Sequence, residues 1–501
     1  MAKTAKKAAG PARAKAAGKA ARKAARPAKA AYRKHAAFGG RMVMIGFGSI
    51  GQGVLPLILR HIDIKPSQIT VISPEDRGGG AELAKFGVAF VRKRLTQDNL
   101  RQVLDKRIGK GDFVVNLSVE VASTALIELC QEKGALYIDT CIEPWPGGYS
   151  DPSLSVSHRS NYALRERALA LRDKFKGGPT AVIAHGANPG LVSHFVKRAM
   201  LNIAKDTGHA VATPTTRQGW AELARDLGIK VIHIAERDTQ VSAKPKEVGE
   251  FVNTWSIDGF VSEGGQPSEM GWGTHEKALP PDGKRHDFGC DAAIYLNRPG
   301  LHTRVRTWTP KEGPFHGFII THNEAISLAD YFTLRNGKRA SYRPTVHYAY
   351  HPCDQAIMSM HEIVGKNLVQ QKRQRLIVDE IDSGIDELGV LLMGHKKGAY
   401  WYGSQLSVDE ARKLAPYNNA TSLQVCAPVL SGIIWALENP QAGLVEADEM
   451  DFERNLEICM PYLGPVVGRY SDWTPLQGRG QLFPEDLDEN DPWQFRNFRV
   501  A

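Results

Sequence analysis

Three glycines in a Gly-x-Gly-x-x-Gly pattern follow an apolar run at residues 42–45 and open a stretch that is typical of a helix through His61. Such a turn exposes backbone N–H groups at a helix N-terminus, where the helix dipole and the missing side chains let a pyrophosphate approach closely. A glycine-rich surface turn is the alternative interpretation, and the regular flanking pattern argues against it. The turn is therefore predicted to bind a dinucleotide, through Gly46, Gly48, Ser49, Ile50 and Gly51.

The residue after the next apolar run, at 69–72, bears on which dinucleotide binds. A dinucleotide fold usually ends this strand with an acid that accepts hydrogen bonds from the adenine ribose, and here Ser73 holds that place, with Glu75 and Asp76 just beyond. No Arg cluster suits a ribose 2′-phosphate, although Arg77 is near. We therefore expect NAD rather than NADP, with Ser73 at the ribose.

Strand-like and helix-like segments then alternate as far as residue 190. Apolar runs at 88–91, 113–117 and 136–139 are separated by helical patterns at 97–105 and 121–133. Alternation of this kind predicts an α/β fold with a doubly wound, mostly parallel sheet covered on both faces. Residues 41–190 are thus expected to form an NAD-binding, Rossmann-like domain.

Polar residues follow the apolar runs at 113–117, 136–139 and 181–185, in segments 116–120, 139–145 and 186–190. Ligands of such sheets lie beyond the carboxyl ends of the strands, so these loops should approach the cofactor. Any one of them could be an ordinary turn, but three near one crevice favour a site. The residues expected to face the cofactor are Asn116, Ser118, Asp139 and Thr140.

Residues 191–501 have longer, less regular segments and predict a second α+β domain for substrate binding and dimerisation. Polar clusters of the kind found around active sites occur in this half, at 234–239, 253–256, 261–264, 321–324 and 384–389. The last segment, with Trp473 and Trp493, is expected to fold back onto the body.

The net charge of +10 is concentrated at the N-terminus. Residues 1–37 carry 12 Lys and Arg and no Asp or Glu, so subtracting 12 from +10 leaves −2 for the remaining chain. This Ala/Lys/Arg-rich sequence predicts a disordered tail over residues 1–40. It could bind polyanions such as nucleic acid, direct the chain to an organelle, or be a solvated extension without a specific partner.

The cysteines and the apolar segments bear on the compartment. Six cysteines are scattered without a C-x-x-C pair, which fits reduced thiols and argues against a zinc site, so we expect no metal. The apolar stretches are too short to cross a bilayer, and no hydrophobic segment typical of a secretory signal follows the N-terminus. A cytoplasmic protein is the simplest interpretation.

From about Val43 to the C-terminus the chain resembles the bacterial homospermidine synthase family. The motifs that carry the resemblance are M-I-G-F-G-S-I-G, Y-I-D-T-x-x-E-P-W, G-A-N-P-G, I-H-I-A-E-R-D-T-Q, F-V-N-T-W-S, T-H-N-E, H-Y-A-Y-H-P-C and G-I-D-E-L-G-V-L-L. More remotely the chain is similar to the saccharopine dehydrogenase-like reductases, which share a dinucleotide domain with an inserted substrate domain.

The resemblance implies an NAD-dependent reaction without net redox change in a homodimer. One putrescine loses hydride to NAD and becomes an imine that releases ammonia, a second putrescine adds, and the stored hydride reduces the new imine to homospermidine. Spermidine can replace one putrescine, with diaminopropane as a product.

The family motifs also imply which residues act. The residues that fall within the family's motifs include Glu143, Asn188, Glu236, Trp255, Glu263, Glu324 and Asp386. We expect Glu143, Asn188, Glu236, Trp255 and His322 to be catalytic, and Glu120, Glu263, Glu324 and Asp386 to bind substrate. Carboxylates and an aromatic face suit a diamine dication, and a desolvated cation–π contact with Trp255 is worth roughly 2 kcal/mol. The reacting amine must be neutral, which costs about 4.6 kcal/mol at pH 7 if its pKa resembles that of lysine. We therefore expect acids at the distal ammonium, Trp255 at the reacting end, and His322 as a proton relay.

Each assignment has an alternative. Glu236 could belong to an ion-pair network with Arg237 and Asp238, Trp255 could be a core aromatic, His322 a structural histidine, and Asn188 a turn residue.

Two rival functions also remain open. A saccharopine-like or carboxynorspermidine-type dehydrogenase would change the net redox state and would need an Arg clamp for a substrate carboxylate, from Arg165, Arg237 or Arg343. A nucleic-acid-associated protein would act through the basic tail.

Overall fold

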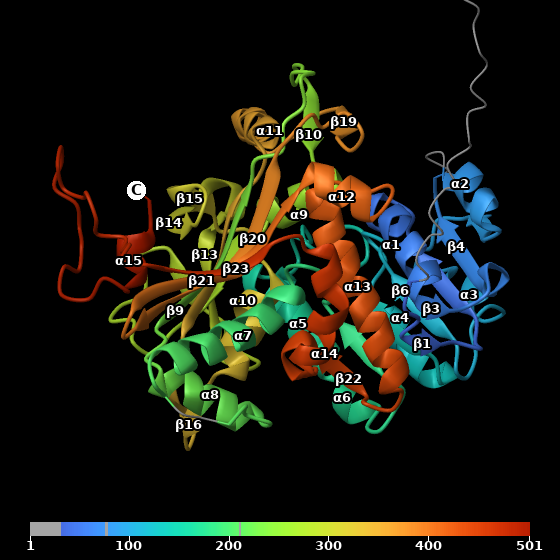
Figure 1. The fold of residues 1–501 in the computed structure, drawn as a ribbon, viewed down its shortest axis with the longest axis horizontal. Coiled ribbons are helices and arrows are strands. Elements are labelled where there is room, and N and C mark those ends of the chain that lie inside the picture. Colours follow the sequence, from blue (N-terminus) through green and yellow to red (C-terminus); the bar gives the residue numbers. More distant parts are fainter. Residues whose placement is uncertain (1–31, 76–78, 210–211, 501) are drawn as a thin grey trace, which may run out of the picture. The chain divides into compact units, whose positions relative to one another are not determined.

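The computed structural model describes residues 32–75, 79–209 and 212–500. A seven-stranded parallel sheet, on the right of Figure 1, has the strand order β22-β8-β7-β6-β2-β4-β5. Its strands are β2 (Met42–Ile45), β4 (Ile69–Ser73), β5 (Ala89–Arg92), β6 (Phe113–Asn116), β7 (Leu136–Asp139), β8 (Ala181–Ile183) and β22 (Leu444–Glu446). Every pairing in this sheet is parallel, and the order reverses around β2, so the predicted doubly wound sheet is confirmed.

Alternate side chains of these strands enter two different cores. Met42 and Met44 pack with residues of α1 (Ser49–His61) and α13 (Ala420–Glu438). Val43 and Ile45 pack on the opposite face, against α3 (Leu100–Leu104) and α4 (Ser123–Lys133). Helices on both faces explain why these strands are continuous apolar runs rather than alternating ones.

A second, mixed sheet fills the other half of Figure 1. Within it only β9 and β18 run parallel among the described strands. Its strands are β9 (Val231–Asp238), β11 (Pro267–Gly271), β12 (Gly283–Arg285), β13 (Ala293–Pro299), β14 (Arg304–Thr309), β15 (Gly313–Phe318), β18 (Thr345–His351), β20 (Ile385–His395), β21 (Gly398–Ser407) and β23 (Val466–Ser471). Helices α7 (Leu191–Asp206) and α10 (Asn323–Tyr331) pack on this sheet, as an α+β domain requires.

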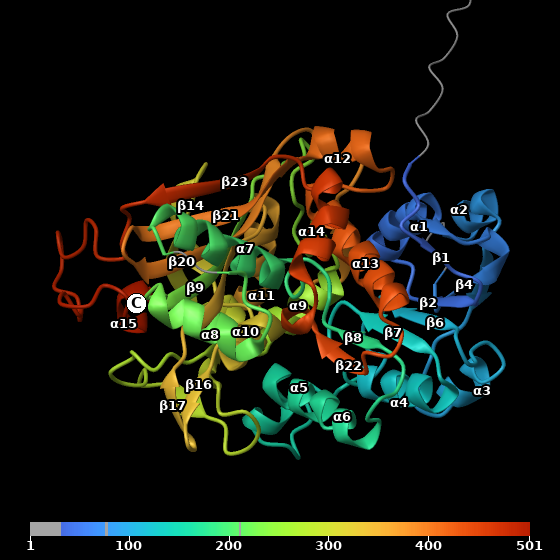
Figure 2. The same cartoon turned by 60° about the horizontal axis from the view of Figure 1, so that its bottom comes forward.

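Shorter elements complete the two halves. The two-stranded sheets pair β1 with β3, β10 with β19 and β16 with β17. These strands and the remaining helices are β1 (Ala36–Ala37), β3 (Ile62–Asp63), β10 (Glu250–Asn253), β16 (Leu334–Asn336), β17 (Arg339–Tyr342), β19 (Arg373–Leu376), α2 (Gly79–Phe86), α5 (Asn161–Leu169), α6 (Leu171–Lys174), α8 (Arg217–Asp226), α9 (Ile257–Gly265), α11 (Asp354–Gly365), α12 (Val408–Leu414), α14 (Phe452–Cys459) and α15 (Phe495–Phe498). Figure 2 shows α5 and α6 close to α4, beside the first sheet.

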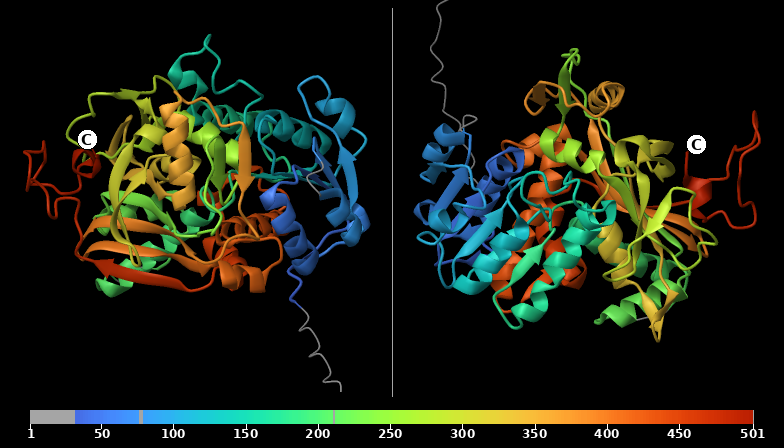
Figure 3. Two further views of the ribbon diagram at one scale, coloured as in Figure 1. Left: turned by 90° about the horizontal axis from the view of Figure 1, so that it is seen from above. Right: turned by 180° about the vertical axis from the view of Figure 1, so that it is seen from behind.

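Helix α13 lies between the two sheets, as Figures 1 and 3 show. It contacts β7 and β8 of the first sheet and β20 and β21 of the second. Of the helices in the described ranges, it alone is long and apolar enough to cross a membrane, yet most of it is buried within the fold. The chain then contributes β22 to the first sheet, a strand that no sequence pattern predicted.

The two ends of the described chain pack onto the body. The sequence predicted disorder through residue 40, but β1 pairs with β3, and Phe38 is buried against Phe113. Sheet pairing and an apolar side chain therefore order this end of the tail, whereas residues 1–31 lie outside the described part of the chain. At the other end, α15 packs its Phe495 edge-on against Trp272.

Candidate active site

A cavity of about 140 Å³ lies where the carboxyl ends of the first sheet meet the second sheet. Loops after β6, β7 and β8 form one wall, while β9, β18, α9 and the start of α10 form the other. The predicted site residues that line it are Ile50, Ser118, Thr140, Glu143, Asn188, Glu236, Trp255, Glu263 and His322. The fold thus brings together residues that are far apart in the sequence.

The glycine turn next to this cavity has the shape that a dinucleotide needs. Gly46 has φ +92°, and a Cβ there would lie 2.6 Å from the carbonyl oxygen of Leu117. A Cβ on Gly51 would lie 2.8 Å from the carbonyl oxygen of Gly46, whereas a Cβ on Gly48 would meet nothing within 4 Å. The first and third glycines are required by close packing, and the second leaves open space at the N-terminus of α1, where a pyrophosphate would bind.

A groove continues from this turn along the ends of the strands. Gly46, Ile72, Pro74 and Ser118 line it, and Ser118 also lines the cavity. The groove starts between β2 and β6, where the strand order reverses, which is the usual dinucleotide position in such sheets. The residues present therefore fit NAD, with Ile50, Ser118 and Thr140 towards the cavity.

Three residues that the sequence placed at the cofactor do not line the groove. Asn116 accepts a hydrogen bond from the Ser118 hydroxyl (2.6 Å). Asp139 accepts hydrogen bonds from the backbone N–H of Ala184 (2.6 Å) and from a tyrosine hydroxyl, and burial raises its pKa to about 6. Ser73 is buried at the end of β4. Polar residues at strand ends thus bond to neighbouring groups of the protein as well as to ligands. Asp76 and Arg77, which follow Ser73 in the sequence, fall outside the described residues.

Glu236 is buried in the middle of the cavity wall, on β9. It accepts hydrogen bonds from the side-chain amide of Asn188 (2.7 Å) and from the hydroxyl of Tyr348. Burial raises the pKa of Glu236 to about 7, although these two hydrogen bonds oppose the shift. Its carboxylate is thus directed into the site, and Arg237 does not pair with it but approaches Glu312 (3.4 Å) instead.

Glu143 follows β7 and is also buried. Its backbone N–H donates to the Ser123 hydroxyl (3.0 Å), which fixes the loop. Burial, followed by the nearby charge of Glu263, raises the pKa of Glu143 to about 8. This carboxyl group is therefore available both as an acid and as an anion near neutral pH.

His322 lies between two carboxylates immediately before α10. Its Nε2 is 3.1 Å from Glu263, and its Nδ1 is 3.3 Å from Glu324. Burial lowers the pKa of His322, but the two carboxylates outweigh burial and raise it to about 10. The imidazole is thus a protonated bridge at neutral pH, which argues against the expectation that it relays protons there.

Trp255 presents its ring to the cavity and is fixed from behind. Its indole N–H donates to the Tyr350 hydroxyl (3.1 Å), and its ring packs edge-on against Phe260. The aromatic ring is therefore held in one position beside the cavity.

Three predicted substrate residues do not reach the cavity. Glu120 is exposed and lies 3.9 Å from Arg94, Glu324 is buried behind His322, and Asp386 is buried behind Thr421. Sequence reasoning assigned no role to Thr421 or Tyr348, which both line the cavity. Tyr348 belongs to the H-Y-A-Y-H-P-C motif, whereas no local pattern marks Thr421.

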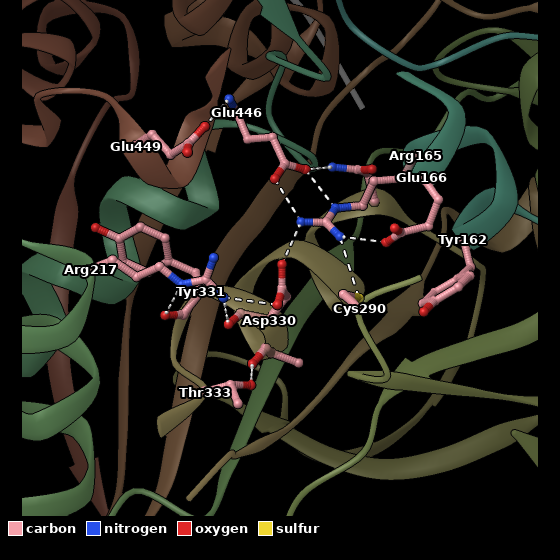
Figure 4. A network of polar contacts seen from close by, with 12 residues as sticks. Tyr162, Arg165, Glu166, Arg217, Cys290, Asp330, Tyr331, Thr333, Glu446 and Glu449 are labelled. Carbon is pink, nitrogen blue, oxygen red and sulfur yellow. Dashed lines mark hydrogen bonds and ion pairs between the residues drawn. The ribbon is translucent and has the colours of Figure 1, made fainter. Parts of the chain in front are cut away.

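The three arginines that could have clamped a substrate carboxylate are engaged elsewhere. Figure 4 shows the buried Arg165 guanidinium held by Glu446 (2.7 Å to each oxygen) and Asp330 (3.0 Å). Arg237 approaches acidic side chains away from the cavity, and Arg343 lines a separate surface hollow. Within the described ranges, no Lys or Arg lines the cavity.

Each half of the chain matches a known protein-domain family. The saccharopine dehydrogenase NADP binding domain family matches residues 42–182, and the saccharopine dehydrogenase C-terminal domain family matches residues 186–471. Together these matches cover the groove, the cavity and both sheets.

Individual proteins match this chain over nearly its whole length. Homospermidine synthase of Blastochloris viridis is 57% identical over 465 residues, which are 92% of this chain and 97% of the relative. Homospermidine synthase of Mesorhizobium japonicum is 54% identical over 468 residues, which are 92% and 96% of the two chains. The crystal structure of homospermidine synthase from Legionella pneumophila in complex with NAD has a TM-score of 0.87 at 52% identity, covering 93% of this chain and 98% of that one. The chain therefore belongs to the homospermidine synthase family.

Proposed function

We propose that this protein is an NAD-dependent homospermidine synthase, which joins two putrescine molecules and releases ammonia. Spermidine in place of one putrescine would release diaminopropane. One observation carries the proposal: the buried cavity wall combines Glu143, Glu236 and Glu263 with the face of Trp255 and, among the described residues, has no Lys or Arg. Such a wall suits a diamine dication and offers nothing to pair with a substrate carboxylate.

The glycine turn and the groove would hold the cofactor, with the backbone of Gly46, Gly48 and Ser49 at the pyrophosphate. When bound, NAD supplies a reversible acceptor for a hydride from the carbon beside the reacting nitrogen. The Legionella pneumophila relative in complex with NAD supports NAD as the cofactor.

The acids of the cavity supply the negative charge for the ammonium groups. Glu143 comes from the loop after β7, Glu236 from β9 and Glu263 from α9, and all three line the cavity. The His322 imidazolium orients Glu263 and reduces the repulsion between the carboxylates. Trp255 stabilises a cation without a hydrogen bond to its nitrogen, so it holds that nitrogen in place while opposing its deprotonation less than a carboxylate in contact with it would.

A product analysis tests this function. Purified protein, NAD and isotopically labelled putrescine should yield labelled homospermidine and ammonia, without a steady rise in NADH absorbance, because the reaction is redox-neutral. Absence of the triamine would contradict the proposal. Net NADH formation with lysine, or net NADH oxidation with 2-oxo acids, would instead support the saccharopine-type rival.

We also propose a cytoplasmic homodimer. All six cysteines are free, which suits a reducing compartment, and the family resemblance supports the dimer. Light scattering of the purified protein measures the assembly. Weak polyanion binding by residues 1–37 is a further proposal, and DNA binding that disappears when this segment is deleted would support it.

A further inference from the structure

One hydroxyl of the cavity wall leads to a pair of buried acids that the roles above leave unused. Thr421, in the first turn of α13, lines the cavity. Its Oγ1 lies 2.5 Å from Oδ2 of Asp386 and 3.4 Å from Oδ2 of Asp238. Both acids are fully buried, and Oδ1 of Asp386 has no hydrogen-bond partner. An ionised carboxylate is costly in such a place unless a cation or a proton compensates it.

A glutamine side chain determines which way the Thr421 hydroxyl points. Oε1 of Gln240 accepts the backbone N–H of Ala420 (3.0 Å), which fixes the orientation of the amide. Nε2 of Gln240 therefore donates to Oγ1 of Thr421 (2.9 Å) and occupies one acceptor position of that oxygen. The hydroxyl has one proton and one other acceptor position left, to share between Asp386 and the cavity.

Two proton arrangements follow, and they prefer different forms of an amine. If Asp386 is ionised, Thr421 donates to it, and the free lone pair of Oγ1 can accept an N–H of an ammonium group. If Asp386 is protonated, it donates to Oγ1, and the Thr421 O–H points into the cavity, where it can donate to the lone pair of a neutral amine. Moving one proton from the ammonium to Thr421 and one from Thr421 to Asp386 converts the first arrangement into the second.

We propose that Thr421 and Asp386 form a proton shuttle that neutralises the reacting nitrogen and returns the proton to the departing nitrogen. The inference rests on the proposed function, which requires both steps. An ammonium nitrogen gives one proton to Thr421 while Asp386 receives the hydroxyl proton, and this leaves a neutral amine and a carboxylic acid. Hydride loss leaves an iminium ion, to which the second diamine adds as a neutral amine, its own ammonium proton having been released to solvent. The added nitrogen then passes a proton to the first nitrogen, which leaves as ammonia, and Asp386 returns its stored proton through Thr421 to that ammonia, which becomes ammonium.

The overall charge balance agrees with a shuttle that stores a proton only temporarily. Two dications react to give one trication and one ammonium ion, so no proton is gained or lost in a turnover. The proton that Asp386 holds between the two steps is transferred within the cavity, and protons released to solvent when the diamines bind are taken up again when the products leave. A closed cavity favours such internal transfer.

The surroundings of Asp386 stabilise its protonated form. Burial, followed by the charges of Glu236 and Asp238, raises its pKa well above the usual range. The titratable groups that face it from β9, β18 and β20 are Glu236, Asp238, Tyr348, Tyr350 and Glu387. None of these is a cation, so a proton is the compensation that the structure offers Asp386.

Four variants of the full chain test the shuttle. Thr421→Val removes the hydroxyl with little change in shape, Thr421→Ser restores it, and Asp386→Asn keeps the shape without the ability to titrate. Thr254→Val is the matched control, because the Thr254 hydroxyl donates to the same acidic cluster, at Asp238 (2.8 Å), but does not line the cavity. NAD content and melting temperature verify that each variant is folded and loaded.

The rate of NADH appearance after rapid mixing with putrescine, in H2O and in D2O, is the first measurement. Thr421→Val and Asp386→Asn should slow it by about 100-fold, the usual scale for losing proton-transfer catalysis, and should reduce the solvent isotope effect. Thr421→Ser should recover most of the rate, and Thr254→Val should keep the isotope effect of the wild type. A Thr421→Val enzyme with the wild-type rate and isotope effect would overturn the shuttle.

Calorimetry of putrescine binding in two buffers with different ionisation enthalpies gives a readout that is independent of turnover. Binding a neutral reacting nitrogen beside protonated Asp386 should release about one proton in the wild type, and Thr421→Val should release less. Equal proton release by both proteins overturns the shuttle. If Thr421→Val does not fold, the rates of NADH appearance in Asp386→Asn and Thr421→Ser test the shuttle instead. A wild-type protein that makes no homospermidine would refute the proposed function itself, which is a different outcome.

Discussion

The proposed reaction places two opposing demands on the residues around the cavity. A diamine arrives as a dication, so carboxylates must attract it, but the nitrogen that reacts must become neutral. In the proposed reaction Glu143, Glu236 and Glu263 would meet the first demand, and the face of Trp255 would attract a cation while opposing its deprotonation less than a carboxylate does. The separation of these roles explains why the wall combines acids with an aromatic ring.

Replacement of Trp255 tests the cation–π contribution. Trp255→Ala should reduce kcat/KM for putrescine at least tenfold, because a desolvated cation–π contact is worth about 2 kcal/mol. Trp255→Phe keeps a weaker ring face, so its kcat/KM should lie between those of the wild type and Trp255→Ala. Steady-state kinetics measure the effect, and NAD content and melting temperature serve as controls. An alanine variant as active as the wild type would contradict the role of the ring.

Replacement of Glu143 tests the pH dependence of binding. Its pKa of about 8 means that it is largely protonated below that pH, and only the ionised form attracts an ammonium. For the wild type, kcat/KM should therefore rise with pH up to about 8, and Glu143→Gln should weaken this rise and lower the plateau. Glu128→Gln, on the surface of α4, is the matched control. An unchanged pH profile in Glu143→Gln would assign the rise to another group.

At the scale of elements, buried Arg165 joins three segments that meet beside the site. It comes from α5, and it binds Glu446 on β22 and Asp330 on α10 (Figure 4). The side-chain amide of Asn323, the first residue of α10, also lies near Glu446 (3.5 Å). The ion pairs thus tie the edge of the first sheet to the helix that starts directly after His322.

Removal of the Arg165 charge should destabilise the fold strongly. Arg165→Met leaves Glu446 buried without a cation and leaves Asp330 with Arg217 alone (2.8 Å), and uncompensated burial of a charge costs about 3–5 kcal/mol of unfolding free energy. The control is Arg172→Met, which breaks a half-exposed pair with Glu449 and should cost less than about 1 kcal/mol. Urea denaturation monitored by circular dichroism compares the two. Similar losses of unfolding free energy in both variants would show that the buried network contributes little to stability.

At the scale of the whole molecule, the two sheets and α13 form the site together. The first sheet supplies the cofactor groove, the second supplies Glu236 and Tyr348, and α13 adds Thr421 between them. No single half of the chain contains a complete site. The proposed catalysis therefore requires the packed assembly of both sheets.

Truncation of the N-terminus separates the tail from this assembly. Deletion of residues 1–31 should leave homospermidine formation and the melting temperature unchanged, because none of those residues lies in a motif of the site. Deletion of residues 1–40 should lower the melting temperature, because it removes β1 and the buried Phe38, whose loss costs about 3–5 kcal/mol by the scale for Phe→Ala. Differential scanning calorimetry measures both. Equal melting temperatures would show that β1 and Phe38 do not stabilise the body.

Local patterns were enough to predict the first sheet and its glycine turn. Strand and helix periodicity and the turn glycines are encoded within short windows, so β2, β4, β5, β6, β7 and β8 were predicted close to their observed positions. The strand β22 was missed because its place in the sheet depends on a segment from the far end of the chain. The same limit applies to Asn116 and Asp139, whose positions at strand ends were correct but whose side chains bond within the protein.

By itself the sequence determined the dinucleotide turn, the parallel sheet, the acidic character of the site and, through its motifs, the family resemblance. Only the tertiary structure decided the charge states and the partners. Tyr348 donates to Glu236 across 112 residues of sequence, and two carboxylates make His322 a bridging cation rather than a neutral base. Burial and contacts between distant segments set pKa values and cavity walls, and neither is encoded in any one stretch of residues.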